Sequence, residues 1–361
     1  MKIITAFDSF KGCLSAKEAC LAAASGIKER FPDAEILNLP MSDGGEGMVD
    51  CIAEALDAEM ITVRVHDPLM QEIDAQYAYA DGIAYMEMAA ASGLTLVPEE
   101  KRNPMLTTTY GVGEMILDSI RRGCERIVMG IGGSATCDGG EGMISFLKPY
   151  LPLPIEIIVA SDVSNPLYGE CGAAYVFAPQ KGATPEQVLL LDQRLRAFAR
   201  QTVDLGFATP ALENHPGAGA AGGLGYGLMA YLDAKLTSGI DLLLDTIQFN
   251  EKIADADLIL TGEGKTDSQT SYEIASEVDG HTQPKKVPMG ILKRGQKQNI
   301  PVLLLSGCIE EKEALLKAGF IDAISINEGD ERPLTELIRP EIASANMKKA
   351  ILSYHLSKLD Q

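Results

Sequence analysis

The feature that most constrains this chain is a short apolar run followed by a glycine-rich loop and then by a helix. Arg126–Met129 predicts a strand, Gly130–Gly142 supplies the loop, and Met143–Leu147 predicts the helix. Glycine between a strand and a helix lets backbone N–H groups approach an anion without obstruction by a Cβ atom. Ser134 and Thr136 add hydroxyl donors to the same loop. The loop therefore predicts phosphate chemistry.

The same order of elements recurs toward both ends of the chain. The strands predicted there are Lys2–Phe7, Glu35–Met41, Leu258–Thr261, Pro301–Ser306 and Asp322–Ile326. Helical stretches alternate with these strands, which is typical of α/β proteins. Neither end alone supplies enough strands for a sheet, but the two ends together do. We therefore predict a doubly wound parallel α/β domain built from residues 1–66 and 251–361.

The middle of the chain, residues 67–250, predicts a second, mixed α/β domain inserted into the first. Asp81 and Gly82 lie between two alternating runs, which is a strong hairpin signal and favours a partly antiparallel sheet. Thr184 and Gln187 form a capping box at the start of a long helix. The length of 361 residues allows two domains, and one large domain is the alternative.

Acidic loops follow three predicted strands of the outer domain. These loops are Asp8–Gly12, Ser42–Gly47 and Glu263–Asp267. In doubly wound sheets the loops at the carboxyl ends of the strands build the site. Lys11 could neutralise a carboxylate or phosphate, and Asp8 could bind a metal or accept a proton. An ordinary charged turn is the alternative for each loop, and for Asp43 an N-cap is the simpler interpretation.

A second glycine loop, Pro216–Gly223, matches the G-x-G-x-x-G pattern. No clear strand precedes it and no acidic residue follows it at dinucleotide spacing, which argues against a Rossmann site for NAD. A phosphate or adenine loop and close helix packing fit this segment equally well.

The composition excludes several classes of protein. The formal net charge of −20 leaves nothing to offset the repulsion from nucleic-acid phosphates. No apolar run is long enough to span a bilayer, and Asp8 comes too early for a signal peptide. The 7 cysteines are scattered, which argues against a disulfide scaffold and a cysteine metal site. We therefore expect a cytoplasmic protein with free thiols that binds neither nucleic acid nor membranes.

The loops together combine glycine, carboxylate and hydroxyl groups with a few lysines, and no nucleophile–histidine pair accompanies them. Phosphoryl transfer needs positioned phosphates, a divalent metal held by carboxylates, and a base for the acceptor hydroxyl. The sequence fits this chemistry better than acyl transfer or hydride transfer.

The same loops carry a resemblance to a known family. The segments are Asp8–Gly12, Ser42–Gly47, Glu87–Leu94, Arg102–Pro104, Thr107–Gly111, Gly130–Thr136, Ala160–Pro166, Gln180–Thr184, Pro216–Gly223 and Thr261–Gly264. In this order, and along nearly the whole chain, they resemble the bacterial glycerate kinase family of the glycerate 2-kinase type. The resemblance implies two α/β domains, one of them flavodoxin-like, with the active site in the cleft between them.

The resemblance also implies ATP- and Mg²⁺-dependent phosphorylation of D-glycerate, with 2-phosphoglycerate as the favoured product. Together with the chemistry of the loops, it assigns catalysis to Asp8, Lys11 and Asp43, with Asp8 as the first choice of base. The predicted substrate contacts are Ser9, Arg102, Asn103 and Lys286. The predicted ATP contacts are Gly132, Gly133, Ser134, Thr136, Gly217, Gly219 and Gly222. The predicted metal ligands are Asp138, Asp162, Glu263 and Asp267.

Three departures from the family pattern leave alternatives open. Cys137 stands where the family usually has Asn, and residues 143–154 form a shorter segment than usual. An insertion over residues 271–285 precedes Lys286, which takes the place of the family's lysine. A kinase for another small hydroxy acid and a non-catalytic protein that binds glycerate or nucleotide are the alternatives. A homodimer is compatible with the same resemblance.

Overall fold

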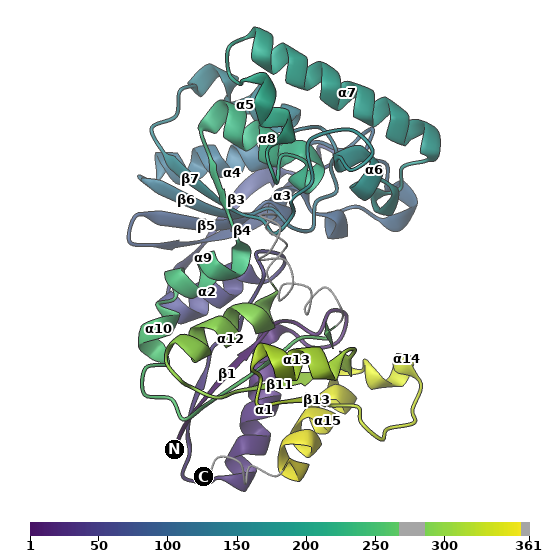
Figure 1. Ribbon diagram of the computed structural model, residues 1–361. Coiled ribbons are helices and arrows are strands. Elements are labelled where there is room, and N and C mark those ends of the chain that lie inside the picture. Colours follow the sequence, from purple (N-terminus) through teal and green to yellow (C-terminus); the bar gives the residue numbers. More distant parts are fainter. Residues whose placement is uncertain (267–285, 355–361) are drawn as a thin grey trace. The chain divides into compact units, whose positions relative to one another are not determined.

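The computed structural model describes residues 1–266 and 286–354 (Figure 1). The chain forms two compact units, and unit 2, Gly44–Leu242, is inserted into unit 1, Met1–Asp43 and Leu243–Gln361. Residues 44–66, which the sequence analysis assigned to the outer domain, belong to unit 2. The reason is that β3 (Glu59–His66) pairs along its length with β4 (Glu72–Ala80) of unit 2.

Within the described residues, unit 1 is built on a five-stranded parallel sheet. Its strands are β1 (Lys2–Phe7), β2 (Glu35–Asn38), β9 (Leu258–Gly262), β11 (Val302–Ser306) and β13 (Asp322–Ser325). They lie in the order β2-β1-β9-β11-β13, with Phe7 opposite Gly262. This is the flavodoxin-like order, in which the topological switch point lies between the first and third strands of the unit, here β1 and β9.

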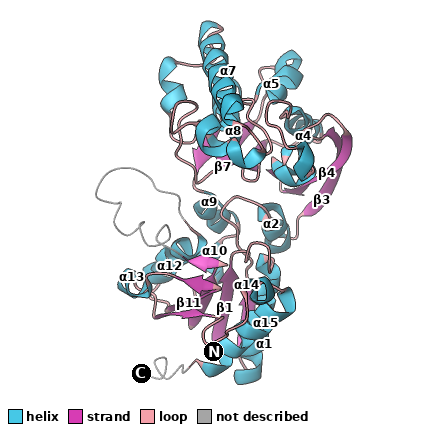
Figure 2. Ribbon diagram, turned by 90° about the vertical axis from the view of Figure 1, so that its right-hand side faces the viewer, coloured by secondary structure: helices cyan, strands magenta, loops and turns pink. Residues whose placement is uncertain are grey.

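Helices cover both faces of this sheet. They are α1 (Ala16–Arg30), α10 (Phe249–Lys252), α12 (Val287–Lys297), α13 (Lys312–Ala318), α14 (Leu334–Leu337) and α15 (Pro340–Ser353). Figure 2 shows α1 and α15 on one face and α12 and α13 on the other. The predicted capping box of Ser15 and Glu18 begins α1. Both faces are therefore apolar, and Ile3, Ile4 and Leu305 are buried. A short parallel pair, β10 (Lys265–Thr266) and β12 (Cys308–Ile309), extends the strand-end side.

Unit 2 is built on a mixed six-stranded sheet, counted over its described residues, in the order β3-β4-β5-β6-β7-β8. Its other strands are β5 (Ile83–Glu87), β6 (Arg126–Gly130), β7 (Glu156–Ala160) and β8 (Lys235–Thr237). The strand β4 runs antiparallel to its neighbours β3 and β5, whereas β5 to β8 run parallel. Asp81 and Gly82 form the turn between β4 and β5 with φ of 48° and 80°, as a tight hairpin requires. The predicted hairpin and mixed sheet are confirmed.

Figure 1 shows α4, α5 and α8 on one face of this sheet and α2 on the other. The helices of the unit are α2 (Met48–Leu56), α3 (Ala89–Ser92), α4 (Tyr110–Arg121), α5 (Glu141–Leu147), α6 (Ala173–Phe177), α7 (Pro185–Asp204) and α8 (Ala220–Leu232), and α9 (Gly239–Thr246) crosses its boundary. Short 3₁₀ turns are η1 (Leu94–Leu96), η2 (Glu99–Lys101), η3 (Lys148–Tyr150), η4 (Pro179–Lys181) and η5 (Pro210–Asn214). The predicted capping box of Thr184 and Gln187 begins α7. Over the described ranges, every helix is too short or too polar to cross a membrane.

Candidate active site

In unit 1, the loops that follow β1 and β9 lie side by side at the switch point. Because Phe7 is paired with Gly262, the next residues along each strand bring Asp8 and Glu263 to the same edge of the sheet. Both side chains are buried, with 5% and 6% of their surface exposed. A Cβ atom on Gly264 would lie 3.2 Å from the Cα atom of Phe10, so the two loops are packed against each other. The strand-end edge of the sheet in unit 1 therefore carries buried carboxylates that lie close to one another.

Asp8 is the most perturbed group of this cluster. Burial is the main cause, and repulsion from Asp43 and Glu263 adds to it; together they raise the pKa of Asp8 to about 7. The N–H of Ser9, which donates to Asp8 Oδ1 at 2.7 Å, and the charge of Lys11 act in the opposite direction. A carboxyl group with a pKa near 7 is matched to the task of a general base at neutral pH.

Glu263 lies next to the hydroxyl group of Thr266, which in turn contacts Ser306. Thr266 Oγ1 lies 3.5 Å from Glu263 Oε1 and 2.6 Å from Ser306 Oγ, and both hydroxyl residues are fully buried. No group of three acidic, histidine or cysteine residues within the described part of the chain has the arrangement of a metal site. Mg²⁺ usually takes only one or two carboxylates and completes its shell with water and phosphate oxygens. The carboxylates of Asp43 and Glu263 fit that requirement, because a cation beside them would relieve the repulsion on Asp8.

In unit 2, the glycine-rich loop after β6 is fixed along one edge by the segment after β5. The N–H of Leu94 donates to the carbonyl of Gly133 at 2.8 Å, and the N–H of Ala135 donates to the carbonyl of Ser92 at 2.9 Å. Gly133 has a φ of 71°, which glycine adopts without strain. Among the residues that the structure describes, the N–H groups of Gly132, Gly133 and Ser134 have no acceptor. Such a run of N–H groups is a binding surface for an anion.

The carboxylate of Asp138 holds the far end of this loop. It accepts hydrogen bonds from the N–H and the hydroxyl of Thr109 at 2.8 and 2.9 Å, and from the N–H groups of Gly140 and Gly142 at 3.1 and 3.2 Å. These four bonds occupy both carboxylate oxygens. The predicted role of Asp138 as a metal ligand stays a prediction, and the hydrogen bonds favour a role in shaping the loop.

A lysine that the sequence analysis did not assign to the site holds the middle of the loop. Lys181, at the end of η4, is 3% exposed, and its Nζ atom lies 2.7 Å from both Ser134 Oγ and the carbonyl of Thr136. Burial lowers the pKa of Lys181 to about 8. A Cβ atom on the next residue, Gly182, would lie 2.2 Å from the carbonyl oxygen of Arg102, so the backbone of the predicted substrate-binding arginine packs against the residue that follows Lys181. The Gln180–Thr184 segment of the family resemblance was the signal that could have identified Lys181.

The second glycine loop packs backbone against backbone. A Cβ atom on Gly222 would lie 2.0 Å from the carbonyl oxygen of Thr136, and one on Gly219 would lie 2.2 Å from that of Pro166. A Cβ atom on Gly217 would lie 2.4 Å from the side chain of Leu236. Close packing therefore explains all three glycines, while their contact with ATP stays a prediction.

The other predicted site residues are divided between the units. In unit 2, Asp162 Oδ1 accepts from the N–H of Gly239 at 3.2 Å, and Asn103 Oδ1 accepts from the N–H of Met105 at 3.1 Å. In unit 1, Lys286 precedes the first turn of α12. Asp267 and the insertion over residues 271–285 lie outside the described residues. Each unit thus supplies its own set of groups, acids and Lys11 in unit 1 and the anion-binding loop in unit 2.

Comparisons with known proteins identify the family. A sequence model of the Glycerate kinase family matches residues 3–151 and 147–353. The chain belongs to the glycerate kinase family. A glycerate kinase of Bacillus subtilis is 41% identical over 355 residues, which cover 90% of this chain and 89% of the relative. Glycerate 2-kinase of Escherichia coli K12 is 38% identical over 356 residues, covering 90% of each chain.

A solved structure agrees with this assignment. The crystal structure of a "putative glycerate kinase 2" from Salmonella typhimurium LT2 is 36% identical, has a TM-score of 0.81, and covers 98% of this chain and 96% of that one. Membership of the glycerate kinase family confirms the predicted α/β fold and the predicted enzyme class, a phosphotransferase with an alcohol acceptor and ATP as the donor.

Cys137 departs from the usual family residue, and its side chain is buried in a core. It is 2% exposed and packs in a cluster that contains Leu167 of the loop between β7 and α6, and Leu191 and Leu195 of α7. Burial raises the pKa of Cys137 to about 11, so the thiol stays neutral. Its place in the core favours a packing role for this side chain within the glycerate kinase fold.

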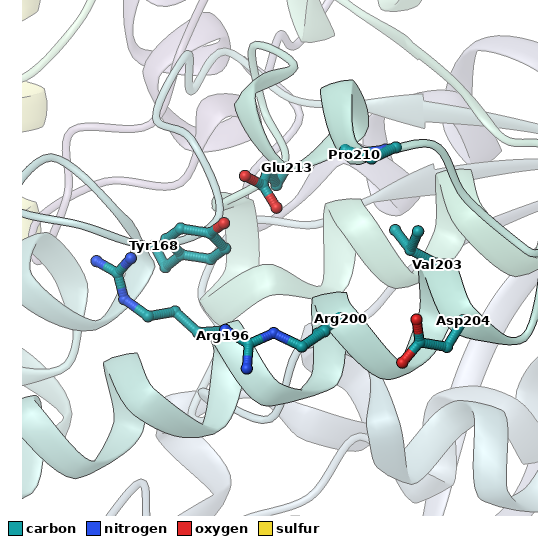
Figure 3. A pocket seen from close by; sticks show the side chains of 7 residues that line it. All are labelled: Tyr168, Arg196, Arg200, Val203, Asp204, Pro210 and Glu213. Atoms are coloured by element: carbon teal, nitrogen blue, oxygen red, sulfur yellow. The ribbon is translucent and has the colours of Figure 1, made fainter.

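A separate pocket of about 180 Å³ lies along α7 in unit 2 (Figure 3). Arg196 stacks over the ring of Tyr168, with its guanidinium carbon 4.3 Å from the ring centroid, and it also pairs with Asp192. Burial and a hydrogen bond to Glu213 raise the pKa of Tyr168 to about 12. The lining residues are Tyr168, Arg196, Arg200, Val203, Asp204, Pro210 and Glu213. None of the predicted site residues lines this pocket.

Proposed function

We propose that this glycerate kinase family member transfers the γ-phosphoryl group of ATP to a hydroxyl of D-glycerate, with 2-phosphoglycerate as the favoured product. Family membership supports the acceptor and the donor. The observation that carries the mechanism is a buried carboxyl group, Asp8, with a pKa raised to about 7 at the switch point of a doubly wound sheet. That position is where such sheets bind ligands.

The loops of unit 1 serve the acceptor. Ser9 N–H occupies Oδ1 of Asp8, which leaves Oδ2 to accept the proton of the glycerate hydroxyl. The ammonium of Lys11 belongs to the same loop, where it pairs with the glycerate carboxylate or with the phosphoryl group during transfer. A new bond forms between the glycerate oxygen and the γ-phosphorus, the bond from that phosphorus to the β,γ-bridging oxygen breaks, and ADP leaves.

The loop after β6 serves the donor. The N–H groups of Gly132, Gly133 and Ser134 have no acceptor among the described residues, and the oxygens of ATP phosphates would supply the acceptors. Arg102, whose Nε atom is buried and lacks a partner within the described ranges, is the guanidinium group that we assign to the same phosphates, because its backbone packs against Gly182, the residue after Lys181. Guanidinium groups suit phosphate oxygens because their donors form a planar fork.

Mg²⁺ is the cofactor we propose, with Asp43 and Glu263 as its protein ligands. When bound, it would supply charge neutralisation at the phosphates. Asp162 and Asp267 stay predicted ligands. A homodimer also stays a prediction, and sedimentation velocity would test it.

Phosphorus NMR of the product from D-glycerate and Mg-ATP tests activity and the site of phosphorylation together. We expect the resonance of 2-phosphoglycerate to appear with stoichiometric ADP. A resonance of 3-phosphoglycerate alone would contradict the proposed regiochemistry. A parallel panel of small hydroxy acids, followed by coupled detection of ADP, tests the acceptor. A higher kcat/KM for another acid, or tight binding of both ligands without turnover, would contradict the proposed activity.

A further inference from the structure

Lys181 is a buried cation that forms no ion pair with any of the residues that the structure describes. Its Nζ atom contacts two neutral oxygens, Ser134 Oγ and the carbonyl of Thr136, each at 2.7 Å. Over the described residues, no carboxylate forms an ion pair with it. An ammonium in such a site costs free energy unless another charge offsets it. Its positive potential is therefore available to an anion bound at the adjoining loop.

We propose that Lys181 is a positioning residue for phosphoryl transfer, which orients the hydroxyl of Ser134 toward a phosphate oxygen of ATP. This inference rests on the proposed function. An ammonium group only donates hydrogen bonds, so Ser134 Oγ accepts from Lys181 and its own O–H group remains a donor. Ser134 is 8% exposed and follows Gly132 and Gly133, whose N–H groups have no acceptor in the described part of the chain. The hydroxyl thereby joins the surface that receives the anion.

Two other buried side chains also favour an anionic ligand. Thr136 Oγ1 and Arg102 Nε are both buried and have no hydrogen-bond partner within the described part of the chain. Arg102 is adjacent to Lys181 through the close contact of its carbonyl with Gly182. Buried polar atoms without partners are rare in folded proteins and call for an explanation such as a ligand. A polyphosphate supplies the acceptors that these donors lack.

The competing explanation is that Lys181 only ties η4 to the loop. A tether of that kind would affect folding, and it would not link the ionisation of Lys181 to catalysis through Ser134. The titratable groups whose charges act on Lys181 are Cys137 and Asp138. The Cys137 thiol stays neutral because its pKa is raised to about 11, so it does not titrate in the range in which Lys181 loses its proton.

The test compares Lys181→Met, Ser134→Ala and the double variant, with Lys235→Met as the control. Lys235 is an exposed lysine of the same unit that pairs with Glu156. We expect Lys181→Met and Ser134→Ala each to lower kcat/KM for ATP by about 10-fold or more, since each loses a hydrogen bond to a charged group. The kcat/KM of the double variant should be no lower than that of the less active single variant, because Lys181 acts through Ser134. Additive losses, or an unchanged kcat/KM in a folded Lys181→Met protein, would overturn the proposal.

The pH profile tests the proposal even where Lys181→Met does not fold. With the pKa of Lys181 lowered to about 8, wild-type kcat/KM for ATP should fall as the pH rises through that value. Ser134→Ala should lack this alkaline limb, although its lysine still titrates. A limb of wild-type amplitude in Ser134→Ala would overturn the proposal.

Failure of the proposed function is distinguishable from failure of this inference. If the wild-type protein makes no phosphoglycerate, the proposed function fails, and binding of tripolyphosphate by calorimetry replaces kinetics. Equal weakening in Lys181→Met and Ser134→Ala, with Lys235→Met unchanged, then supports the positioning role. Unchanged binding in Ser134→Ala or in a folded Lys181→Met protein overturns it.

Discussion

The strand-end loops of the two units carry opposite kinds of charge. In unit 1, the loops after β1, β2 and β9 supply Asp8, Asp43 and Glu263, and repulsion from Asp43 and Glu263 contributes to the raised pKa of Asp8. In unit 2, the loop after β6 presents backbone N–H groups above a buried lysine whose pKa is lowered by burial. The carboxylates of unit 1 would be stabilised by a cation, and the N–H groups and the lysine of unit 2 would be stabilised by an anion.

With the proposed roles, this difference would let a protein of net charge −20 bind two anionic substrates. A carboxylate cluster attracts a divalent cation and provides a base, whereas N–H groups and an ammonium attract phosphate. Phosphoryl transfer needs both. The comparison therefore predicts that substitutions in unit 1 act on the chemical step, and that substitutions in the loop of unit 2 act on the nucleotide.

Asp8→Asn should have the largest effect. Loss of a general base lowers kcat by about 10²–10⁴-fold. The amide oxygen can still accept from Ser9, so the protein should fold. Steady-state assays with Asp33→Asn, an exposed acid of the same unit, provide the matched control. A kcat within a few-fold of wild type for Asp8→Asn would show that Asp8 is not the general base.

Gly222→Ala should have the largest effect on folding. Its φ is 68°, and the new Cβ atom would meet the carbonyl oxygen of Thr136 at 2.0 Å. We expect a loss of about 2–4 kcal/mol, read from thermal unfolding. Gly12→Ala is the matched variant in unit 1, since its φ is 73° and nothing lies within 4 Å of the Cβ position. It should cost only about 1–2 kcal/mol. Equal losses would show that packing does not distinguish the two glycines.

Activity and stability should respond to pH in opposite directions. Asp8 must be ionised to act as a base, so kcat/KM should rise as the pH rises through about 7. The folded protein binds more protons at Asp8 than the unfolded chain between pH about 4 and 7. The stability from this group is therefore full below its unfolded pKa and is lost as the pH rises through about 7.

Glu87 provides the counterpart in unit 2. It accepts from the N–H of Val49 at 3.0 Å, and burial raises its pKa to about 7 as well. Glu87→Gln and Asp8→Asn should each flatten the fall of Tm with pH. Only Asp8→Asn should abolish the acid limb of kcat/KM. If Glu87→Gln abolishes that limb instead, the base belongs to unit 2.

Cys137→Ser should have the smallest effect on catalysis. The side chain packs with Leu191 and Leu195, so the hydroxyl would lower stability by about 1 kcal/mol and leave kcat nearly unchanged. Thermal unfolding and steady-state kinetics on the same preparation separate the two. A large change in kcat at unchanged Tm would indicate that Cys137 contributes to the active site and not only to packing.

Local signals in the sequence were sufficient for much of the fold. The strand Lys2–Phe7, the capping boxes at Ser15 and Thr184, and the Asp81–Gly82 turn each depend on neighbouring residues, and the structure confirms all of them. The boundary at residue 66 differs from the observed one because residues 59–66 join unit 2 through the pairing of β3 with β4, which the sequence analysis did not predict.

Lys181 and Asp138 show why the site could be predicted only in part. The surroundings of Lys181 depend on loop residues 47 and 45 positions earlier in the chain, Ser134 and Thr136, which its Nζ atom contacts. Asp138 resembles a metal ligand in sequence, yet its partners include Thr109 on another segment. Strand-end acids such as Asp8 could be predicted because their place follows from topology alone.

The most direct test of the division between the two units is the equilibrium affinity for a non-hydrolysable ATP analogue with Mg²⁺, measured by calorimetry on Asp8→Asn and Ser134→Ala in parallel. The account predicts that Asp8→Asn binds the analogue within about twofold of wild type while its turnover is lost. It predicts that Ser134→Ala binds about 10-fold more weakly. Weakened binding in Asp8→Asn together with wild-type binding in Ser134→Ala would contradict the account.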